Sequence, residues 1–553
     1  MLALCSLVMT ARAQGVESPP VTSFKPDSAM PSVNVPEFVI TGKAHIELPK
    51  ADKPTVKIDS TYFQNRELTG VEVNVPVDRS LSEREKGSNT QSSSLFARMS
   101  IGRYSTANYL VSGNSSVSGF NINGSVSGDY TSGFIPNTLQ RDFSIDGGIS
   151  KDINVEGGIK SSNAMNLGYT RSGYSLYGVT QRVLQRSTNE TRLGINSDMF
   201  LGELPLAFSL NFDRFSLSDD WVNTQSSLRL KASSQIQLPS GWIGLSGSFL
   251  FGDHTLSASP TNPILLSAFP FTAPSLNRSS YNFAVGASYG NTLFLGSLSY
   301  SLGVRYFQYR DDSSSTVAKI YPDVRANYRI NGMVSLFAGF TGTVRDASLS
   351  EFLSTDRYVN GLVSLINTQD NADFTLGSTI ALDNGLRLTP RFDLRNSKYL
   401  PMFISDQRYE SRLAYAGKAT ITSFSLRAEY TLGGFSSDMT IMYQKGTADS
   451  LSSIPNLPPF NIELGAEYEI TPQVAASAKF LLLSSRYADL ALSDKLNPVG
   501  LLDLRVSYDF DIARLPIEIF VGGNNILDQK YFIWQGYQEF PLTIYIGVSS
   551  RIL

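Results

Sequence analysis

The sequence predicts an all-β protein: a large transmembrane antiparallel up-and-down β-barrel of about 22 strands, with an extended N-terminal arm. Apolar and polar residues alternate with period two in segment after segment from residue 94 to the end. Many of these segments are longer than the strands of about five to six residues usual in soluble sheets. Their apolar faces often end in Tyr or Phe, as in the aromatic girdles of membrane barrels. A soluble β-sandwich also alternates, but strand length and aromatic placement favour the barrel.

Composition excludes several other classes of protein. Charged residues make up 17% of the 553 residues, against roughly a quarter in average soluble domains. No run of about 20 apolar residues is present, which excludes a helical membrane protein. A net charge of -3 gives no indication of nucleic-acid binding. Two His and one Cys leave little for transition-metal ligation or Cys/His catalysis.

The chain divides into three predicted parts. Residues 1–13 have an apolar run followed by Ala11-Arg12-Ala13, which fits a signal peptide with its cleavage site. Residues 14–93 are rich in Pro, Ser and charge, so we expect an extended periplasmic arm with no packed core. Two apolar segments in this arm, residues 36–48 and 70–77, could pair with a sheet edge. Residues 94–553 are the predicted outer-membrane barrel.

The last third of the chain illustrates the two faces of the predicted strands. Leu502, Leu504, Val506 and Tyr508 alternate with charged and polar residues. A closed sheet satisfies every backbone group inside hydrocarbon, so lipid takes the apolar face and the lumen takes the polar one. Leu504 and Ile544 are therefore expected to face lipid, and Ser507 and Thr543 the lumen. Further charged residues expected in the lumen are Arg427, Glu463, Glu467, Glu469, Asp503 and Arg505.

Short and long connections are expected at opposite ends of the barrel. The predicted tight turns are Gly290-Asn291, Asn331-Gly332, Asp383-Asn384-Gly385 and Thr471-Pro472. The predicted long loops are residues 253–277, 346–371, 446–459 and 488–500.

Three stretches resemble the TonB-dependent outer-membrane receptors: residues 521–553, 339–353 and 454–470. The first resembles that family's closing hairpin, with Asn525-Ile526-Leu527-Asp528-Gln529-Lys530-Tyr531 in the turn. The resemblance implies a location in the outer membrane of a Gram-negative-type bacterium. It also implies a C-terminal assembly signal for the barrel-insertion machinery, consisting of Tyr545, Gly547, Ile552 and Leu553. Ile552 stands where the family usually has a terminal aromatic residue.

The N-terminal part departs from this family. Its receptors carry a plug domain of well over a hundred residues, whereas only about 80 residues lie between the predicted signal peptide and the first predicted strand here, without a plug signature. The segment Glu37-Phe38-Val39-Ile40-Thr41 is similar to a TonB box or to the first strand of a plug. The alternative is an apolar stretch in a linker.

No catalytic, cofactor-binding or metal-binding residues are predicted, so an enzyme is not expected. His254 could act as a general base with Asp253 and Ser257, but we expect an exposed loop histidine. Asp219-Asp220 and Asp311-Asp312 could offer oxygen ligands to calcium, but each supplies only two carboxylates, and we expect solvated loop tips.

Three functions remain open from the sequence. The resemblance implies uptake or translocation of a scarce, bulky solute, with the arm touching TonB. The alternatives are a plugless pore and a non-transporting barrel that anchors a surface or periplasmic assembly. The expected partners are outer-membrane lipid, the insertion machinery, and TonB or a separate plug or periplasmic protein; nucleic acid is not expected.

Overall fold

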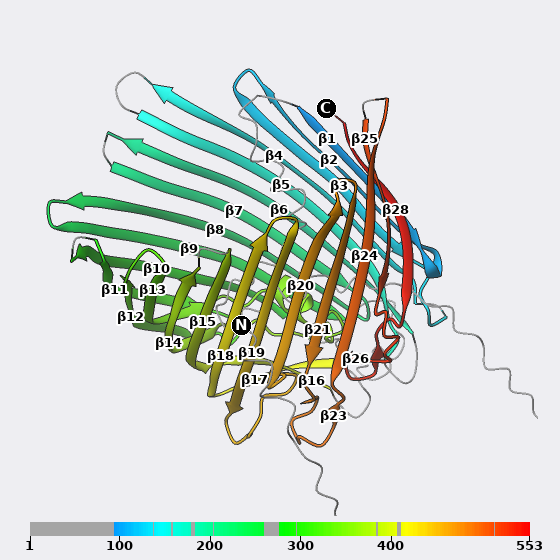
Figure 1. Ribbon diagram of the computed structural model, residues 1–553. Helices are drawn as coiled ribbons and strands as arrows, with labels where there is room; N and C mark the ends of the chain where they lie inside the picture. The colour runs from blue at the N-terminus through cyan, green and yellow to red at the C-terminus, as the bar shows by residue number, and fades with distance from the viewer. Residues whose placement is uncertain are drawn as a thin grey trace, which may run out of the picture. The chain divides into compact units, whose positions relative to one another are not determined.

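The computed structural model describes residues 93–553, apart from residues 137, 156–158, 179–182, 203, 259–275, 295, 383–384, 406–410, 514 and 553. Twenty-two strands form a single antiparallel sheet that closes on itself (Figure 1). The first strand, β1 (Ser94–Gly102), pairs with β2 (Thr106–Val117) on one side and with the last strand, β28 (Thr543–Ile552), on the other. The predicted fold class and the predicted strand number are therefore confirmed.

Each remaining strand of the ring pairs with its neighbours in chain order. These strands are β3 (Phe120–Thr131), β4 (Gln140–Val155), β5 (Ile159–Leu176), β6 (Leu184–Leu201), β7 (Leu204–Ser218), β8 (Trp221–Leu238), β9 (Gly241–Ala258), β10 (Leu276–Leu293), β11 (Leu298–Arg310), β12 (Thr316–Arg329), β13 (Val334–Arg345), β14 (Thr368–Ala381), β15 (Leu386–Lys398), β18 (Ala419–Leu432), β19 (Phe435–Ala448), β20 (Phe460–Thr471), β21 (Val474–Leu483), β24 (Val499–Ile512) and β25 (Leu515–Asn524).

The smaller elements lie in connections between these strands. They are the 3-10 turn η2 (Arg103–Ser105), the helix α4 (Leu349–Thr355), and three hairpins: β16 (Leu400–Ser405) with β17 (Ser411–Ala416), β22 (Arg486–Tyr487) with β23 (Lys495–Leu496), and β26 (Phe532–Trp534) with β27 (Tyr537–Gln538). In the part of the chain that the structure describes, no helix has the length and apolarity needed to cross a bilayer.

The barrel has a short-turn end and a long-loop end. Because Leu95 pairs with Ile552, both ends of the barrel domain lie at the short-turn end. The connections that contain α4, β16–β17 and β26–β27 all lie at the opposite, long-loop end, the lower end of the ring in Figure 1. In outer-membrane barrels the short turns are periplasmic and the longer loops extracellular.

The predicted turns at Asn331-Gly332 and Thr471-Pro472 are confirmed, but the predicted turn at Gly290-Asn291 is wrong. These two residues lie inside β10, and the chain turns only after Leu293. A Cβ atom on Gly290 would lie 2.3 Å from the ring of Trp242, so glycine is required there for packing. The predicted loop from residue 253 also starts too early, since β9 continues to Ala258.

The predicted alternation of faces is confirmed along β24 and its neighbours. Val506 and Tyr508 are each 51% exposed on the outer, lipid-facing wall. On the inner wall, Arg505 lies 2.7 Å from Glu518. Arg427 lies 2.8 Å from Glu429 on the same strand. Charged side chains in the lumen therefore pair either between neighbouring strands or along one strand.

Candidate functional site

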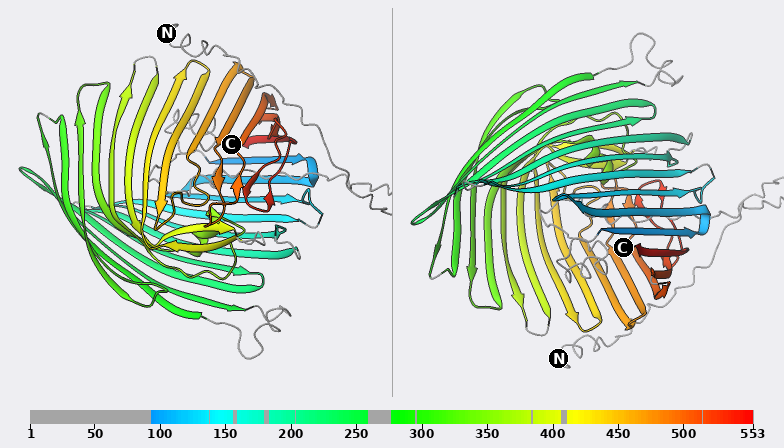
Figure 2. Two further views of the ribbon diagram at one scale, coloured as in Figure 1. Left: turned by 90° about the horizontal axis from the view of Figure 1, so that it is seen from below. Right: turned by 90° about the horizontal axis from the view of Figure 1, so that it is seen from above.

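Three connections from the long-loop end fold inward and form a cap over the lumen. The cap consists of residues 346–367 with α4, the hairpin β16–β17, and residues 525–542 with β26–β27; Figure 2 shows the yellow hairpin β16–β17 inside the ring of strands. Buried apolar side chains of the cap pack together with the long-loop ends of β5 and β7. The cluster comprises Tyr174, Leu176, Leu217, Leu349, Phe352, Leu353, Tyr358, Val359, Val363, Leu365, Phe403, Trp534 and Tyr537.

This cluster extends across the mouth of the barrel. Its members come from β5 and β7, from the connection after β15, and from the connection before β28, which are well-separated parts of the ring. The rings of Tyr358 and Tyr537 stack with their centroids 3.7 Å apart, and Phe403 contacts Trp534 edge-on at 5.9 Å. Aromatic pairs of this kind add stability beyond their buried area. The cap is therefore a small hydrophobic core.

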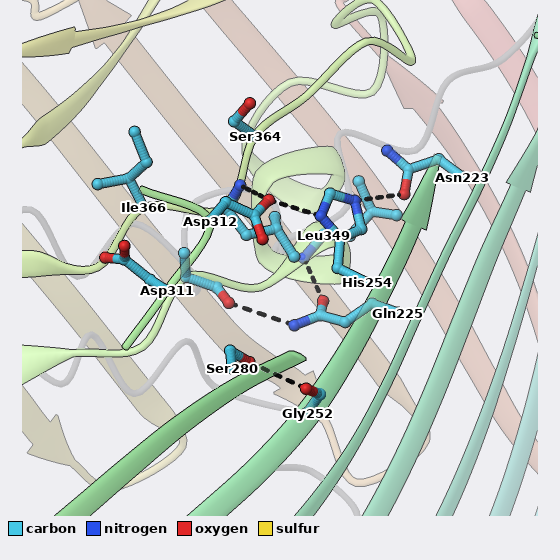
Figure 3. A network of polar contacts seen from close by, with 12 residues as sticks. Asn223, Gln225, Gly252, His254, Ser280, Asp311, Asp312, Leu349, Ser364 and Ile366 are labelled. Carbon is cyan, nitrogen blue, oxygen red and sulfur yellow. Dashed lines mark hydrogen bonds and ion pairs between the residues drawn. The ribbon is translucent and has the colours of Figure 1, made fainter. Parts of the chain in front are cut away.

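A buried polar network fastens the cap to the barrel wall (Figure 3). His254 on β9 lies 2.6 Å from Asp312 through Nδ1 and 2.8 Å from the side-chain oxygen of Asn223 through Nε2. Asp312 also accepts a hydrogen bond from the backbone N–H of Leu365, at 2.7 Å. Its neighbour Asp311 accepts one from the N–H of Asn367, at 2.8 Å. Two adjacent carboxylates thus hold the end of the cap's first segment.

The start of the same segment is held by β8 and β10. Asp346 lies 3.0 Å from Arg229 and accepts a hydrogen bond of 2.6 Å from the side-chain amide of Asn282. Gln225 accepts a hydrogen bond of 2.7 Å from the N–H of Leu349, the first residue of α4 (Figure 3). The helix is therefore anchored at its N-terminus by a wall residue.

Charged groups are buried in the cap and in the wall beside it. Arg186 on β6 and Asp219 after β7 form an ion pair of 2.6 Å in which both side chains are 1% exposed. Burial raises the pKa of Asp356 to about 6, although Ser411 donates a hydrogen bond to this carboxylate. Burial also raises the pKa of Glu539 to about 7, against the opposing effect of Arg357. Closing the cap therefore removes carboxylates from water.

A polar chamber of about 1180 Å³ lies beneath the cap, between the underside of residues 346–357 and the inner wall of β2–β9. Its lining is mainly hydroxyl, amide and charged side chains, such as Thr170, Asn211, Glu190 and Arg192. This volume is above the range of about 300–1,000 Å³ typical of small-molecule sites. The chamber can hold a bulky, hydrated solute.

The structure corrects the predictions for one histidine and three aspartates. His254 is 2% exposed and lies on a strand, so it is not an exposed loop residue. Asp311 and Asp312 are buried and bond to the cap, and Asp219 pairs with Arg186, so none of these three is a solvated loop tip. Among the described residues, no group of three or more His, Cys, Asp or Glu side chains is placed to hold a metal ion.

The structure describes most of the predicted assembly signal but none of the predicted TonB box. Glu37, Phe38, Val39, Ile40 and Thr41 lie outside the described residues, as does Leu553. Tyr545, Gly547 and Ile552 all lie on β28. A Cβ atom on Gly547 would lie 2.3 Å from the ring of Phe520, so only glycine fits where β28 meets β25.

Sequence reasoning missed the cap, although a signal was present. The connection between β13 and β14 contains Leu349, Phe352, Leu353, Tyr358 and Val359, an unusual number of apolar residues for a solvated loop. Such a loop must bury these side chains somewhere, and the lumen is the nearest enclosed space.

Comparison with known proteins gives one family and a set of similar structures. The sequence profile described as "TonB dependent receptor-like, beta-barrel" matches residues 87–526. The FrpB iron transporter from Neisseria meningitidis is similar with 10% identity and a TM-score of 0.64, over 85% of this chain and 83% of that chain. The ferripyoverdine receptor of the Pseudomonas aeruginosa outer membrane is similar with 11% identity and a TM-score of 0.62, over 84% and 72%. The copper transporter OprC is similar with 13% identity and a TM-score of 0.63, over 83% and 80%. No curated protein matches the sequence.

Proposed function

The chain belongs to the TonB-dependent receptor-like β-barrel family, and from this premise we propose that it imports a bulky polar solute through the chamber beneath its cap. It is an outer-membrane barrel of a family of receptors and transporters. The observation that carries the proposal is the polar chamber of about 1180 Å³ closed over by a hydrophobic cap. A permanently open pore has no use for such a cap.

The cap acts as the gate in this proposal. Solute enters when the cap segments separate, and the chamber's hydroxyl, amide and charged groups replace part of its hydration. Gates of this kind rely on loops that change position between two packed arrangements. The buried carboxylates and the network at His254 would set the balance between these arrangements.

A disulfide can test whether cap opening is required. Val359 and Ser411 are bridge partners in neighbouring strand-like segments of the cap, so their Cα atoms lie at a separation that a disulfide can span. The double variant V359C/S411C should lose uptake when oxidised and regain it on reduction. Accumulation of copper and of ferripyoverdine, which the names of two similar structures mention, supplies the first readout. Uptake that is unchanged by oxidation would contradict a gating cap.

We further propose that residues 1–13 are removed as a signal peptide and that residues 14–93 form a periplasmic arm that contacts TonB through residues 37–41. Ile40→Pro removes a backbone donor from this segment and should abolish coupling without affecting barrel assembly. Crosslinking to TonB is the measurement. Unchanged crosslinking and unchanged uptake would assign the arm to a linker or lumen-filling role, or to a separate periplasmic partner.

The last strand supports a role in assembly. Tyr545, Gly547 and Ile552 lie on the strand that closes the ring against β1, and we assign them, together with Leu553, the contact with the barrel-insertion machinery. Ile552→Asp should slow membrane assembly in a pulse-labelling experiment, whereas Arg551→Gln, on the lumen face, should leave it unchanged. Equal assembly rates would refute the assignment.

A further inference from the structure

Three arginines gather on the outer wall of β4, β5 and β7. Arg141, Arg171 and Arg214 are all exposed, and each points away from the lumen, because the adjacent residues Asp142, Thr170 and Asp213 on the same strands line the chamber. They are neighbours through the strand register. Phe143, two residues from Arg141, pairs with Arg171, and Thr191, the partner of Tyr169, pairs with Arg214.

The register sets the spacing of the three guanidinium groups. Diagonal neighbours on one face of a sheet, such as Arg141 and Arg171, lie about 7–8 Å apart, within reach of long side chains. Arg171 and Arg214 are two strands apart, about 10 Å across the sheet, and are offset by two residues, about 7 Å along it. Cations at these spacings can contact two anionic groups on one molecule.

The arginines stand at the upper limit of the lipid-facing apolar belt. On β7 the outward residues Leu204, Leu206, Phe208, Leu210 and Phe212 precede Arg214. On β5 the belt ends at Tyr169, just before Arg171. The belt on β7 therefore has about the length of a transmembrane strand, and the charge begins where hydrocarbon gives way to headgroups.

The surroundings of the arginines leave their charge free for an external ligand. Their outward neighbours Asn189, Thr191 and Ser216 are polar and uncharged. Within the described residues, none of the three guanidinium groups forms an ion pair with a carboxylate. Elsewhere at this end the exposed outward cations are isolated, such as Arg310 on β11 and Lys445 on β19.

We propose that Arg141, Arg171 and Arg214 bind the phosphate groups of an outer-leaflet glycolipid of the lipid A class, whose acyl chains lie along the apolar belt below. The guanidinium group matches phosphate with two parallel hydrogen bonds, and it is more weakly hydrated than an ammonium group. A phosphorylated glycolipid with several acyl chains satisfies both the charge and the apolar surface. The site rests on the orientation in which the long-loop end faces outward.

Binding of defined lipids to the purified full-length protein tests the site. Native mass spectrometry measures retention of bis-phosphorylated lipid A, with the dephosphorylated lipid of equal acylation as comparison. The double variant R141Q/R171Q should bind the bis-phosphorylated lipid at least about fivefold more weakly than the unchanged protein, consistent with the loss of charge-assisted hydrogen bonds. The matched control R310Q/K445Q, which removes two isolated outward cations, should bind as the unchanged protein does.

Two further measurements distinguish this proposal from its alternatives. The single variant R214Q should show a partial loss, and heat-modifiable migration of every variant verifies that the barrel is folded. Equal binding by R141Q/R171Q and the unchanged protein, or equal binding of the phosphorylated and dephosphorylated lipids, would overturn the proposal. If inorganic phosphate at millimolar concentration displaces the lipid completely, the site is a general anion site and the glycolipid assignment fails.

Discussion

His254 on β9 and Asp312 in the turn between β11 and β12 are 58 residues apart in the chain, yet Nδ1 of the histidine lies 2.6 Å from Oδ2 of the aspartate in a buried environment. The other ring nitrogen faces the side-chain oxygen of Asn223, whose amide nitrogen donates to the carbonyl of Gly361. Both ring nitrogens therefore face acceptors. These contacts join β8, β9 and the turn between β11 and β12 to the cap.

Asp312→Asn should loosen the cap without unfolding the barrel. The substitution replaces the carboxylate that faces Nδ1 of His254 and accepts from the N–H of Leu365 with a neutral amide, and leaving buried polar groups without a partner costs about 1–3 kcal/mol. Limited proteolysis of intact cells should cut residues 346–367 faster in the variant. Asp253→Asn serves as control, since Asp253 lies on the outer face of β9, where its carboxylate accepts a hydrogen bond from Ser279. Equal cleavage of both variants would show that the network does not hold the cap.

Arginine substitutions should distinguish the two faces of the barrel. Leu504→Arg or Ile544→Arg places a charge toward lipid and should cost about 2–4 kcal/mol near the midplane. Ser507→Arg should be mild, because Ser507 lies on the lumen side of β24. We do not expect Arg at Thr543, the other position assigned to the lumen, to be mild, because Thr543 is fully buried. Unfolding in urea from lipid vesicles measures these costs, and equal costs at positions 504 and 507 would invert the assigned faces.

The closed cap should weaken as pH rises from about 4.5 to about 7. Burial raises the pKa of Glu539 to about 7 in the closed cap, whereas in an open cap its pKa is near the ordinary value of 4.5. Between these two pH values Glu539 is therefore protonated when the cap is closed and ionised when the cap is open. The proton is lost on opening, and stability of the closed state therefore falls across this window. Cleavage of the cap should be faster at about pH 8 than at about pH 5. Glu539→Gln should flatten this dependence, whereas the exposed Glu351→Gln should retain it; a pH profile unaffected by Glu539→Gln would refute the role of this carboxylate.

Cysteine labelling should establish the orientation of the barrel. A Cys placed in the connection between β9 and β10 should react with an impermeant maleimide on intact cells, because this connection belongs to the long-loop end. A Cys at Ser240, in the short turn between β8 and β9, should react only after the outer membrane is disrupted. The reverse pattern would place the cap on the periplasmic side.

The ring could be predicted from the sequence because its pattern is local. Lipid on one side and lumen on the other impose period two on each strand. The lipid-facing side of Leu504 and the lumen-facing side of Arg505 can therefore be predicted from their neighbours in the sequence alone. The cap could not be predicted in the same way. His254, Asp312 and Leu365 meet only once the ring has closed, and nothing in the neighbourhood of each residue in the chain indicates the others.

Glycine positions illustrate a second source of error. Gly290-Asn291 has the composition of a tight turn, but Gly290 is needed because the ring of Trp242 on the neighbouring strand leaves no room for a Cβ atom. A residue pair that favours a turn can also satisfy a close contact inside a strand, and only the register distinguishes the two.

Conductance in planar bilayers tests most directly the claim that the cap closes the mouth of the barrel. Four proteins are compared: the full chain, the chain without residues 14–93, the chain with residues 349–365 replaced by a Gly/Ser linker, and the chain with both changes. The cap accounts for closure if the protein without residues 14–93 stays silent and the protein with both changes conducts steadily. Steady large conductance from the protein that lacks residues 14–93 but keeps its cap would contradict the account.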